Sequence, residues 1–358
     1  MLLSLITFTK NMYIDSHVHF RDFNQKHKET IKHGLEVAYD SGLDAVFDMP
    51  NTDPPIMTRD LAVRRLNLAR ENRVKGVFYG LYMGLTADPE QIRTAVGLYR
   101  EFPQIIGMKL YAGHSVGNLG VTEEDDQRIV YKTLAEEGFE GVLAVHCEKE
   151  SKLHPELWNP EMPITHCHAR PEEAEVESVH DQLTYVRETK YKGKIHIAHI
   201  SSPKAVDLVV NAKEEGIDAS SGICPHHFIY DWTQMYNENG VLWKMNPPLR
   251  SPKSRAEAFK QLKQGRIDWI ETDHAPHSLT EKLENPFMSG IPGVAWWPVF
   301  EEFLRQNEFT DSEIEKLTHT NIVNRFGVDI PKSRRKVKDR RKDYPFDAYE
   351  QMAIELDW

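Results

Sequence analysis

The chain has 358 residues, of which 40% are apolar and 28% are charged, and its formal net charge is −11. These proportions are ordinary for a globular protein and exclude a disordered or fibrous chain. The excess of acidic residues disfavours nonspecific binding to nucleic acid or to an anionic membrane surface, although a single pocket can still be locally positive. Because no stretch of about 18 apolar residues occurs, we expect no membrane span.

The three cysteines, Cys147, Cys167 and Cys224, are too few for a disulfide framework and match no zinc-finger spacing. Nothing in the sequence requires an oxidising compartment, so we expect a cytoplasmic protein. The N-terminal MLLSLITF lacks the basic region and the small-residue cleavage site of a signal peptide. We interpret residues 1–12 as an arm that precedes the first strand.

Short runs rich in β-branched residues alternate with longer helix-like segments. The expected strands are residues 13–20, 44–49, 76–83, 105–111, 141–147, 194–200, 217–223 and 267–272. The expected helices are residues 28–41, 59–72, 89–101, 123–137, 171–189, 203–215, 252–264, 294–306 and 311–326. Glycines that end three of these helices and prolines that begin four of them support the bounds.

Strands that are each followed by a helix predict a parallel sheet with right-handed crossovers. Eight such units close most simply into a (β/α)₈ TIM-type barrel, which we place at residues 13–330 together with a C-terminal helix. A doubly wound open sheet is the alternative, but no GxGxxG loop follows the first strand to support dinucleotide binding. Residues 331–358 begin with a strongly basic run, which is typical of a solvated or disordered tail; an oligomer contact or an acidic partner is the alternative.

Polar residues with metal-ligand chemistry stand at the ends of the expected strands. In a barrel of this kind the catalytic residues lie at the C-terminal ends of the strands. In the first strand, polar residues occur at every second position, so a strand points them all to one face. The candidates are Asp15, His17, His19 and Arg21 on the first strand and Asp48, Asn51, Lys109, His146, His199 and Asp273 after later strands.

Any one of these histidines is more often a structural residue, but the whole set is hard to obtain by chance. Imidazole and carboxylate ligands suit Zn²⁺, and the same ligands accept Mn²⁺, Fe²⁺ or Co²⁺. Lys109 is unfavourable as a buried ammonium beside metal ions. An amine that has reacted with CO₂ becomes a carbamate, an anion able to bridge two metals. The alternative is a lysine that binds a nearby carboxylate or the substrate, and position alone does not decide.

Several motifs together resemble the dihydroorotases of the amidohydrolase superfamily. They are DSHVHFR at 15–21, MPNT at 49–52, MKLYA at 108–112, HCE at 146–148, RPEEAE at 170–175, NPPLR at 246–250, TDHAPH at 272–277, GIPG at 290–293 and TNIVNRFG at 320–327. The HxH pair and the final aspartate mark only the superfamily. The combination of HxHxR, MPNT, NPPLR and DHAPH is much more specific.

The resemblance implies a metal-dependent cyclic amidase that reversibly hydrolyses (S)-dihydroorotate to N-carbamoyl-L-aspartate in pyrimidine (UMP) biosynthesis. It implies two Zn²⁺ ions per subunit, a bridging hydroxide that attacks the ring amide, and Asp273 as the proton shuttle. The implied ligands are His17 and His19 for one ion, His146 and His199 for the other, carbamylated Lys109 as the bridge, and Asp273.

The resemblance also implies how the substrate is held. Arg21 offers a planar fork suited to bidentate binding of a carboxylate. The other matching positions are Asn51 and His277 at the same carboxylate, and Asn246, Pro292 and Gly293 at the ring. Hydantoinases and dihydropyrimidinases act on uncharged rings and have no need of such an arginine.

Many relatives with these motifs carry an accessory β-sandwich domain built from both chain ends. We expect no such domain here, which is a departure from those relatives. The triplet His166–Cys167–His168 is not a family motif, and we interpret it as a polar loop, with a third metal site as the alternative. We interpret the remaining histidines as structural: His114, His154, His180, His196, His226 and His227. The polar segment 278–289 is either a mobile lid or an ordinary surface loop.

Two other functions stay open. One is another cyclic amide hydrolase, such as a hydantoinase or dihydropyrimidinase. The other is a noncatalytic dihydroorotase-like subunit that scaffolds a partner such as aspartate transcarbamoylase, although every expected ligand position is filled here. Dimers are common in the family, so a homodimer is compatible with the resemblance. The expected partner is a small-molecule substrate.

Overall fold

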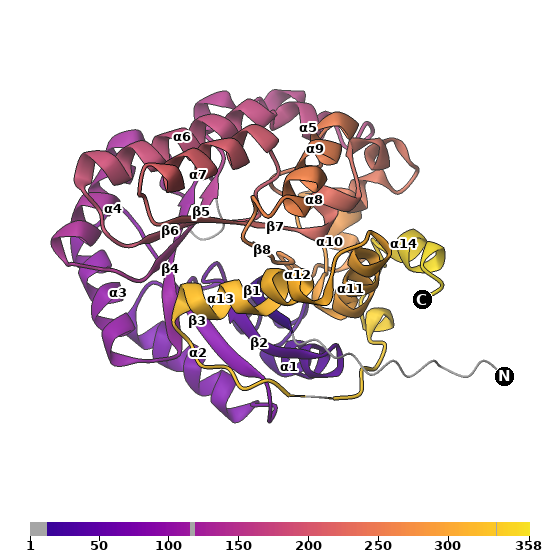
Figure 1. Cartoon of the computed structure of the whole chain (residues 1–358), viewed down its shortest axis with the longest axis horizontal. Helices are drawn as coiled ribbons and strands as arrows, with labels where there is room; N and C mark the ends of the chain where they lie inside the picture. Colours follow the sequence, from indigo (N-terminus) through magenta and orange to yellow (C-terminus); the bar gives the residue numbers. More distant parts are fainter. Residues whose placement is uncertain (1–12, 115–118, 334) are drawn as a thin grey trace.

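The computed structural model describes residues 13–114, 119–333 and 335–358. Its eight parallel strands follow one another in chain order around a nearly closed barrel (Figure 1). They are β1 (Tyr13–Val18), β2 (Leu43–Asp48), β3 (Phe78–Gly84), β4 (Ile105–Ala112), β5 (Val142–Cys147), β6 (Lys194–Ile197), β7 (Ala219–Ile223) and β8 (Trp269–Ile270). The eight expected strands and the barrel are therefore confirmed, although β6 and β8 are shorter than the expected 194–200 and 267–272.

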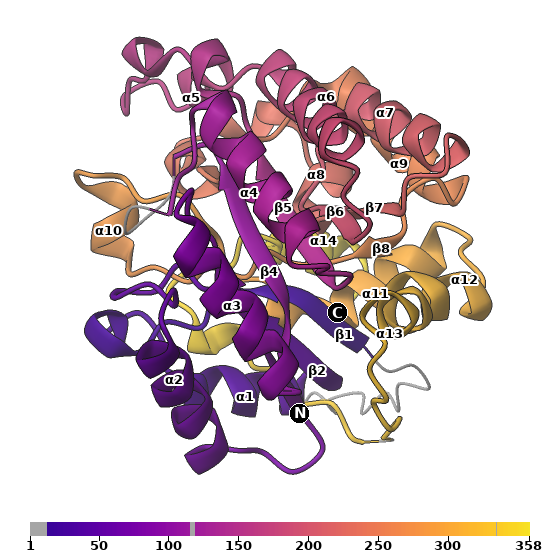
Figure 2. The ribbon, with the colours of Figure 1, turned by 90° about the vertical axis from the view of Figure 1, so that its left-hand side faces the viewer.

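The helices lie outside the strands, as the two views at right angles show (Figures 1 and 2). The α-helices are α1 (Ile31–Asp40), α2 (Arg59–Glu71), α3 (Pro89–Glu101), α4 (Glu124–Glu136), α5 (Thr165–Ala169), α6 (Glu172–Thr189), α7 (Pro203–Glu214), α8 (Pro225–Ile229), α9 (Pro252–Lys263), α10 (Leu279–Leu283), α11 (Trp297–Gln306), α12 (Asp311–Glu315), α13 (Asn321–Phe326) and α14 (Glu350–Glu355). Single turns of tighter or wider helix are η1 (Phe23–Gln25), η3 (Glu150–Lys152), η4 (Pro155–Leu157), η5 (Trp232–Tyr236), η6 (Gly240–Trp243), η7 (Val294–Trp296), η8 (Lys316–Thr320) and η9 (Arg341–Asp343). No helix among the described residues is long and apolar enough to cross a membrane.

Local sequence explains where these helices begin. Thr58 and Ser202 precede α2 and α7, and their side chains accept hydrogen bonds from the backbone N–H groups of Leu61 and Ala205. Proline occupies the first turn of α3, α7 and α9, where its missing N–H costs nothing. The expected helix at 311–326 is interrupted by the π-helical turn η8 between α12 and α13.

Apolar side chains fill the space inside the barrel and between the barrel and its helices. Every residue of β1, β2, β4 and β5 is buried. The seam between β8 and β1 is the thinnest part of the barrel, since its ladder consists of a single bridge between Val18 and His274. The His19 N–H donates to the His274 carbonyl at 2.8 Å across the same seam.

The basic C-terminal segment packs on the barrel, so the expectation of a solvated or disordered tail is wrong. Arg335 pairs with buried Asp44, and Lys338 and Arg340 pair with Asp40 at 2.8 and 2.6 Å. Tyr349 is fully buried beside α11. Because three of its cations pair with aspartates of the barrel and Tyr349 is buried, the segment is part of the folded unit.

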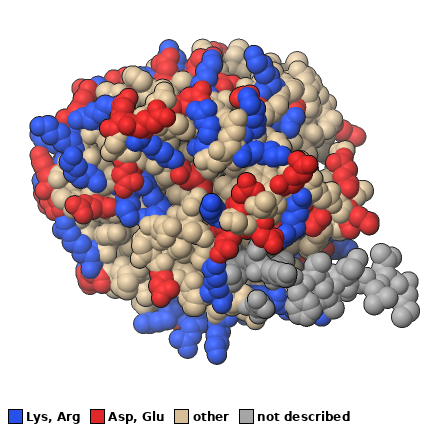
Figure 3. Space-filling view, viewed as in Figure 1, with Lys and Arg blue, Asp and Glu red and all other residues tan. Residues whose placement is uncertain are grey.

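No accessory β-sandwich is present among the described residues, since all their strands belong to the barrel. The arm expected at residues 1–12 lies outside the described residues. Acidic and basic side chains are interspersed over the face shown in Figure 3, which carries no large patch of one sign.

Candidate active site

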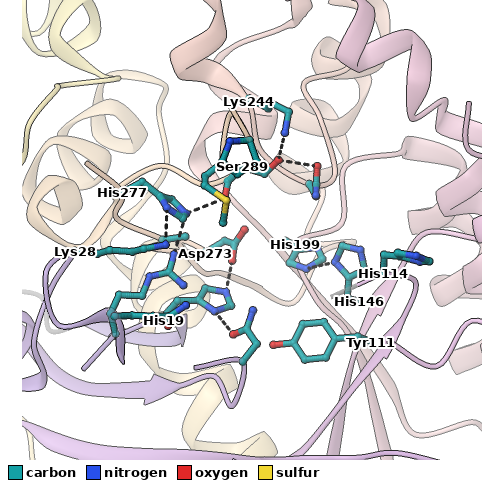
Figure 4. Close-up of a pocket in the computed structure, with 18 of the residues that line it drawn as sticks. His19, Lys28, Tyr111, His114, His146, His199, Lys244, Asp273, His277 and Ser289 are labelled. Carbon is teal, nitrogen blue, oxygen red and sulfur yellow. Dashed lines mark hydrogen bonds and ion pairs between the residues drawn. The ribbon is translucent and has the colours of Figure 1, made fainter. Parts of the chain in front are cut away.

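A cavity of about 350 Å³ opens at the C-terminal ends of the strands (Figure 4). Its floor is formed by side chains from the ends of β1, β4, β5 and β6 and from the residues after β8. One wall is formed by the segment 286–290, which follows α10. The sequence candidates that line it are His17, His19, Arg21, Asn51, His146, His199, Asn246, Asp273 and His277.

The first group of candidate ligands joins β1 to the residue that follows β8. His17 Nε2 and His19 Nε2 lie 3.3 and 2.8 Å from the same oxygen, Asp273 Oδ1. The ligand atoms of these three side chains lie within 4.8 Å of one another. His19 Nδ1–H donates to Asn51 Oδ1 at 2.6 Å, so in the neutral imidazole the lone pair on Nε2 faces the carboxylate. A lone pair and a carboxylate oxygen that face each other repel, so this geometry favours a cation between them.

The second group lies beside the first. His146 Nδ1 and His199 Nε2 are 3.1 Å apart, and the His17 and His199 rings are 5.1 Å apart. His199 and Asp273 have φ angles of 39° and 51°, in the left-handed region that non-glycine residues rarely adopt. Such strain persists only where surrounding contacts hold it, and it concentrates at functional sites.

Lys109 is a buried amine that does not line the cavity, although its charge acts on His17 and His199. Its side chain is completely buried, and among the described residues its Nζ has no hydrogen-bond partner. Burial lowers the pKa of Lys109 to about 8, against the opposing effect of the Glu271 carboxylate. A buried polar group without a partner is costly. The unpartnered amine, the two histidine pairs and the carboxylate therefore fit a metal centre, and they fit a carbamylated lysine.

The electrostatics of the first group follow from burial and from its neighbours. Burial by itself would raise the pKa of Asp273, but the close contact with His19 and the proximity of His17 hold that pKa well below its usual range. Burial, together with the charge of Lys109, lowers the pKa of His17 to about 4. His17 is therefore neutral and Asp273 is ionised at neutral pH, which are the protonation states that metal ligation needs of these two side chains.

Arg21 forms the cationic part of the cavity. It is 5% exposed, its Nε–H donates to the Pro276 carbonyl at 3.3 Å, and its Nη2 lies 3.2 Å from His277 Nε2. Among the described residues no carboxylate forms an ion pair with Arg21. Because buried charges are otherwise paired, this guanidinium fits a site for an anionic ligand.

Pro292 and Gly293 are buried but are not among the residues that line the cavity, whereas Gly290 of the same motif is. Gly293 instead donates its N–H to His274 Nδ1 at 3.0 Å. Asp48, another strand-end candidate, is bound by Arg65 at 2.6 Å and lies outside the cavity lining.

Sequence reasoning missed several residues of the cavity. Lys28 Nζ lies 2.8 Å from Glu281 and 3.3 Å from His277 Nδ1. Lys244 donates to the Phe287 carbonyl at 2.7 Å, and burial lowers its pKa to about 8. No motif marks either lysine, although Lys244 stands two residues before NPPLR. The other unpredicted residues are Gln25, Tyr111, His114, Ala275, Pro286, Phe287, Met288, Ser289 and Gly290.

The remaining histidine clusters do not join this site. His166 Nε2–H donates to the Met245 carbonyl at 2.9 Å, and no ligand group forms at His166–Cys167–His168 among the described residues. Cys224, His226 and His227 form a second buried group at the end of β7. In that group His227 Nε2–H donates to the Pro247 carbonyl at 3.0 Å, and His226 Nδ1 bonds the Tyr349 hydroxyl at 3.2 Å.

A (β/α)₈ barrel with an HxH pair, two further histidines, a lysine and an aspartate at the ends of its strands defines the class of metal-dependent amidohydrolases. No family model matches the chain. A dihydroorotase of Brevibacillus brevis is 32% identical over 314 residues, which are 85% of this chain and 70% of that protein. A dihydroorotase of Methanosarcina mazei is 31% identical over 333 residues, covering 88% and 70% of the two chains. The chain belongs to the dihydroorotase family, whose members are metal-dependent cyclic amidases.

Solved structures with the same fold are hydantoinases. The L-hydantoinase (dihydropyrimidinase) of Arthrobacter aurescens superposes with a TM-score of 0.78 at 21% identity, over 88% of this chain and 70% of that chain. A D-hydantoinase superposes with a TM-score of 0.74 at 18% identity, with the same coverage. At these identities the likeness shows the shared barrel fold.

Proposed function

We propose that this chain is a dihydroorotase, which interconverts (S)-dihydroorotate and N-carbamoyl-L-aspartate on the route to UMP. The observation that carries the proposal is Arg21, a buried guanidinium that faces the cavity without an ion-pair partner among the described residues. Dihydroorotate carries a carboxylate that would pair with this guanidinium, whereas hydantoin and dihydrouracil carry no carboxylate. His277 and Asn51 line the same cavity and complete the proposed carboxylate site.

We propose that the metal centre holds two Zn²⁺ ions. His17 and His19 with Asp273 would hold one, His146 and His199 would hold the other, and carbamylated Lys109 would bridge them. When bound, the ions would polarise the ring carbonyl and make water acidic enough to react at neutral pH.

The protein's own residues would transfer the proton and hold the substrate. The Asp273 carboxylate is ionised and would accept the proton of the attacking water and give it to the ring nitrogen as the C–N bond breaks. General acid–base transfer of this kind contributes about 10²–10⁴-fold to the rate. Arg21, Asn51 and His277 would hold the carboxylate, and Asn246 would hold the ring beside the reacting bond. Ring closure follows the same steps in reverse.

The proposal is tested by following the ultraviolet absorbance of L-dihydroorotate with the wild type and with Asp273→Ala. Hydantoin and dihydrouracil serve as uncharged controls, and elemental analysis reports the metal content of both proteins. We expect turnover of dihydroorotate alone, and its loss in the variant. Preference for the uncharged rings would favour the hydantoinase alternative, which the solved hydantoinase structures fit in fold. A wild type that binds no metal would favour the scaffold alternative.

Residues 13–330 are proposed as the catalytic unit. A cytoplasmic location, a homodimer and an association with aspartate transcarbamoylase stay predictions from the resemblance. Sedimentation of the purified chain, alone and mixed with a transcarbamoylase, would test the last two.

A further inference from the structure

Glu271 is a buried carboxylate beneath the candidate metal centre. It follows β8 directly, two residues before Asp273, and its side chain is 1% exposed. Neither its type nor its position belongs to the motifs on which the family resemblance rests. A carboxylate taken out of water is stable only where several donors point at it. The contacts of Glu271 therefore show what it holds in place.

One oxygen of Glu271 touches both halves of the metal centre. The backbone N–H of His199 donates to Oε1 at 2.7 Å, and His17 Nδ1 lies 3.5 Å from the same oxygen. His17 belongs to the first group of candidate ligands and His199 to the second. The bond to His199 also holds the backbone whose φ is 39°, the strained conformation from which its ring meets His146.

The other oxygen anchors the carboxylate itself. Ser16 Oγ–H and Trp269 Nε1–H donate to Oε2 at 2.9 and 3.0 Å, and His196 Nε2 lies 3.2 Å away. The His196 ring stacks on Trp269 with centroids 4.2 Å apart. These contacts prevent Glu271 from turning toward other partners. His196 thus has a supporting role beneath the site.

Gly222 on β7 leaves the space that Glu271 occupies. A Cβ at residue 222 would lie 2.6 Å from Glu271 Cδ and 2.7–2.8 Å from both oxygens. Real Cβ atoms essentially never approach another atom so closely. Any side chain at this position would therefore move the carboxylate away from His17 and His199.

We infer that Glu271 is a positioning residue of the metal centre: it orients the His17 ring and the His199 backbone from below, and so sets how tightly the chain binds metal. The inference rests on the proposed function, because it takes these histidines as metal ligands. Groups that hold the second ring nitrogen of a ligating histidine change metal affinity by about 10–100-fold when they are removed.

The test compares the Zn²⁺ affinity of the metal-free wild type with that of Glu271→Gln and Gly222→Ala, by competition with a chromophoric chelator. Glu271→Gln keeps the size of the side chain, but removes its charge and places an amide N–H₂ where donors already point. Gly222→Ala keeps the carboxylate and displaces it. We expect both variants to bind Zn²⁺ about 10–100-fold more weakly than the wild type.

Asp44→Asn is the matched control. Asp44 is also a buried carboxylate, but it lies at the amino end of β2 and binds Arg335 and Ser333. We expect Asp44→Asn to lower the stability of the metal-free protein without changing its Zn²⁺ affinity. If Glu271 had only a structural role, Glu271→Gln would likewise lower the stability and leave the Zn²⁺ affinity unchanged. Circular dichroism of each metal-free variant checks its fold.

Wild-type affinity in folded Glu271→Gln and Gly222→Ala would overturn the inference and leave the proposed function standing. If Glu271→Gln does not fold, the affinity of Gly222→Ala decides by itself. A wild type that binds no Zn²⁺ in this assay would overturn the metal centre of the proposed function, and the inference with it. The two failures are therefore distinguishable.

Discussion

Arg21 sets the charge of the cavity at the scale of a single residue. Burial lowers its pKa, but an arginine remains charged at neutral pH. The protein thus keeps a buried cation whose nearest fixed contacts are the Pro276 carbonyl and His277. Such a group is costly without an anion and strongly favourable with one, so it discriminates between charged and neutral rings.

The first prediction concerns Arg21→Met, which keeps an apolar chain and removes the fork. A lost hydrogen bond to a charged group costs about 1.5–3 kcal/mol, so kcat/KM for dihydroorotate should fall about 10–100-fold. Steady-state kinetics on dihydroorotate and on any uncharged ring that the wild type turns over give the measurement.

Arg59→Met is the control for Arg21→Met, because Arg59 pairs with Glu101 at an exposed surface. Arg59→Met should leave kcat/KM unchanged for both dihydroorotate and the uncharged ring. A loss of the same size on charged and uncharged rings would show that Arg21 supports the fold of the cavity instead of reading the carboxylate.

At the scale of elements, the C-terminal segment supports the barrel. Tyr349, at the start of α14, packs on Phe300 of α11 with ring centroids 4.8 Å apart. Its hydroxyl bonds His226 Nδ1 on α8 at 3.2 Å. Tyr344 donates to Glu29 Oε1 at 3.0 Å, before α1. One short segment therefore ties together elements from the start and the end of the chain.

The second prediction is that Tyr349→Ala lowers the free energy of unfolding by about 3–5 kcal/mol, as removal of a buried aromatic ring does elsewhere. Urea unfolding of the metal-free protein measures it. Ile354→Ala on the same helix is the control, because Ile354 is 69% exposed and its loss should cost less than about 0.5 kcal/mol. Equal stabilities of the two variants would mean that α14 does not contribute to the fold.

The third prediction concerns His33 on α1, which links that helix to the C-terminal segment. Its Nδ1 lies 3.0 Å from Glu29 Oε1 and its Nε2 lies 3.2 Å from Asp343 Oδ2. The Glu29 hydrogen bond, opposed by burial and aided by Asp343, raises the pKa of His33 above its ordinary value of 6.5. Because folding raises this pKa, the stabilisation is complete below pH 6.5 and is lost as pH rises through the folded value.

His33→Gln should therefore lower the free energy of unfolding most at pH values below 6.5, and the difference from the wild type should shrink at higher pH. Urea unfolding of both proteins across this range gives the curve. A difference that is constant with pH would show that protonation of His33 does not hold the segment.

At the scale of the whole molecule, the candidate ligands come from strands on different sides of the barrel. They come from β1, β4 and β5 and from the residues after β6 and β8, so a bound ion would connect strands that lie far apart in sequence. His17 and Asp273 face each other across the β1–β8 seam, where the backbone ladder is reduced to one bridge. Metal binding and barrel stability should therefore be coupled.

The fourth prediction is that chelation lowers the Tm of the wild type and that added Zn²⁺ restores it. An ion present at 1,000 times its Kd adds about 4 kcal/mol to the stability of the folded state. Calorimetry with and without chelator measures the shift. Asp273→Ala should show a much smaller shift, and an identical Tm of the wild type under both conditions would contradict the coupling.

Much of the fold could be predicted because its signals are local. Prolines and capping residues mark helix starts, as at Ser202 and Pro203, and apolar runs mark each strand. The barrel follows from the repeated strand–helix order. The C-terminal segment could not be predicted from its charge, because three of its cations pair with Asp40 and Asp44, about 300 residues away in the chain.

The sequence by itself determined the class of the barrel, the side chains that gather at its mouth and the family to which the chain belongs, because these depend on periodicity and on short motifs. Only the tertiary structure showed that Lys28 and Lys244 line the cavity, that Arg21 has no ion-pair partner among the described residues, and that Glu271 lies beneath both histidine pairs. Those facts depend on contacts between β1, β6, β7 and β8, whose residues are distant in the chain. No local pattern encodes such contacts, since they form only when the strands close into a barrel.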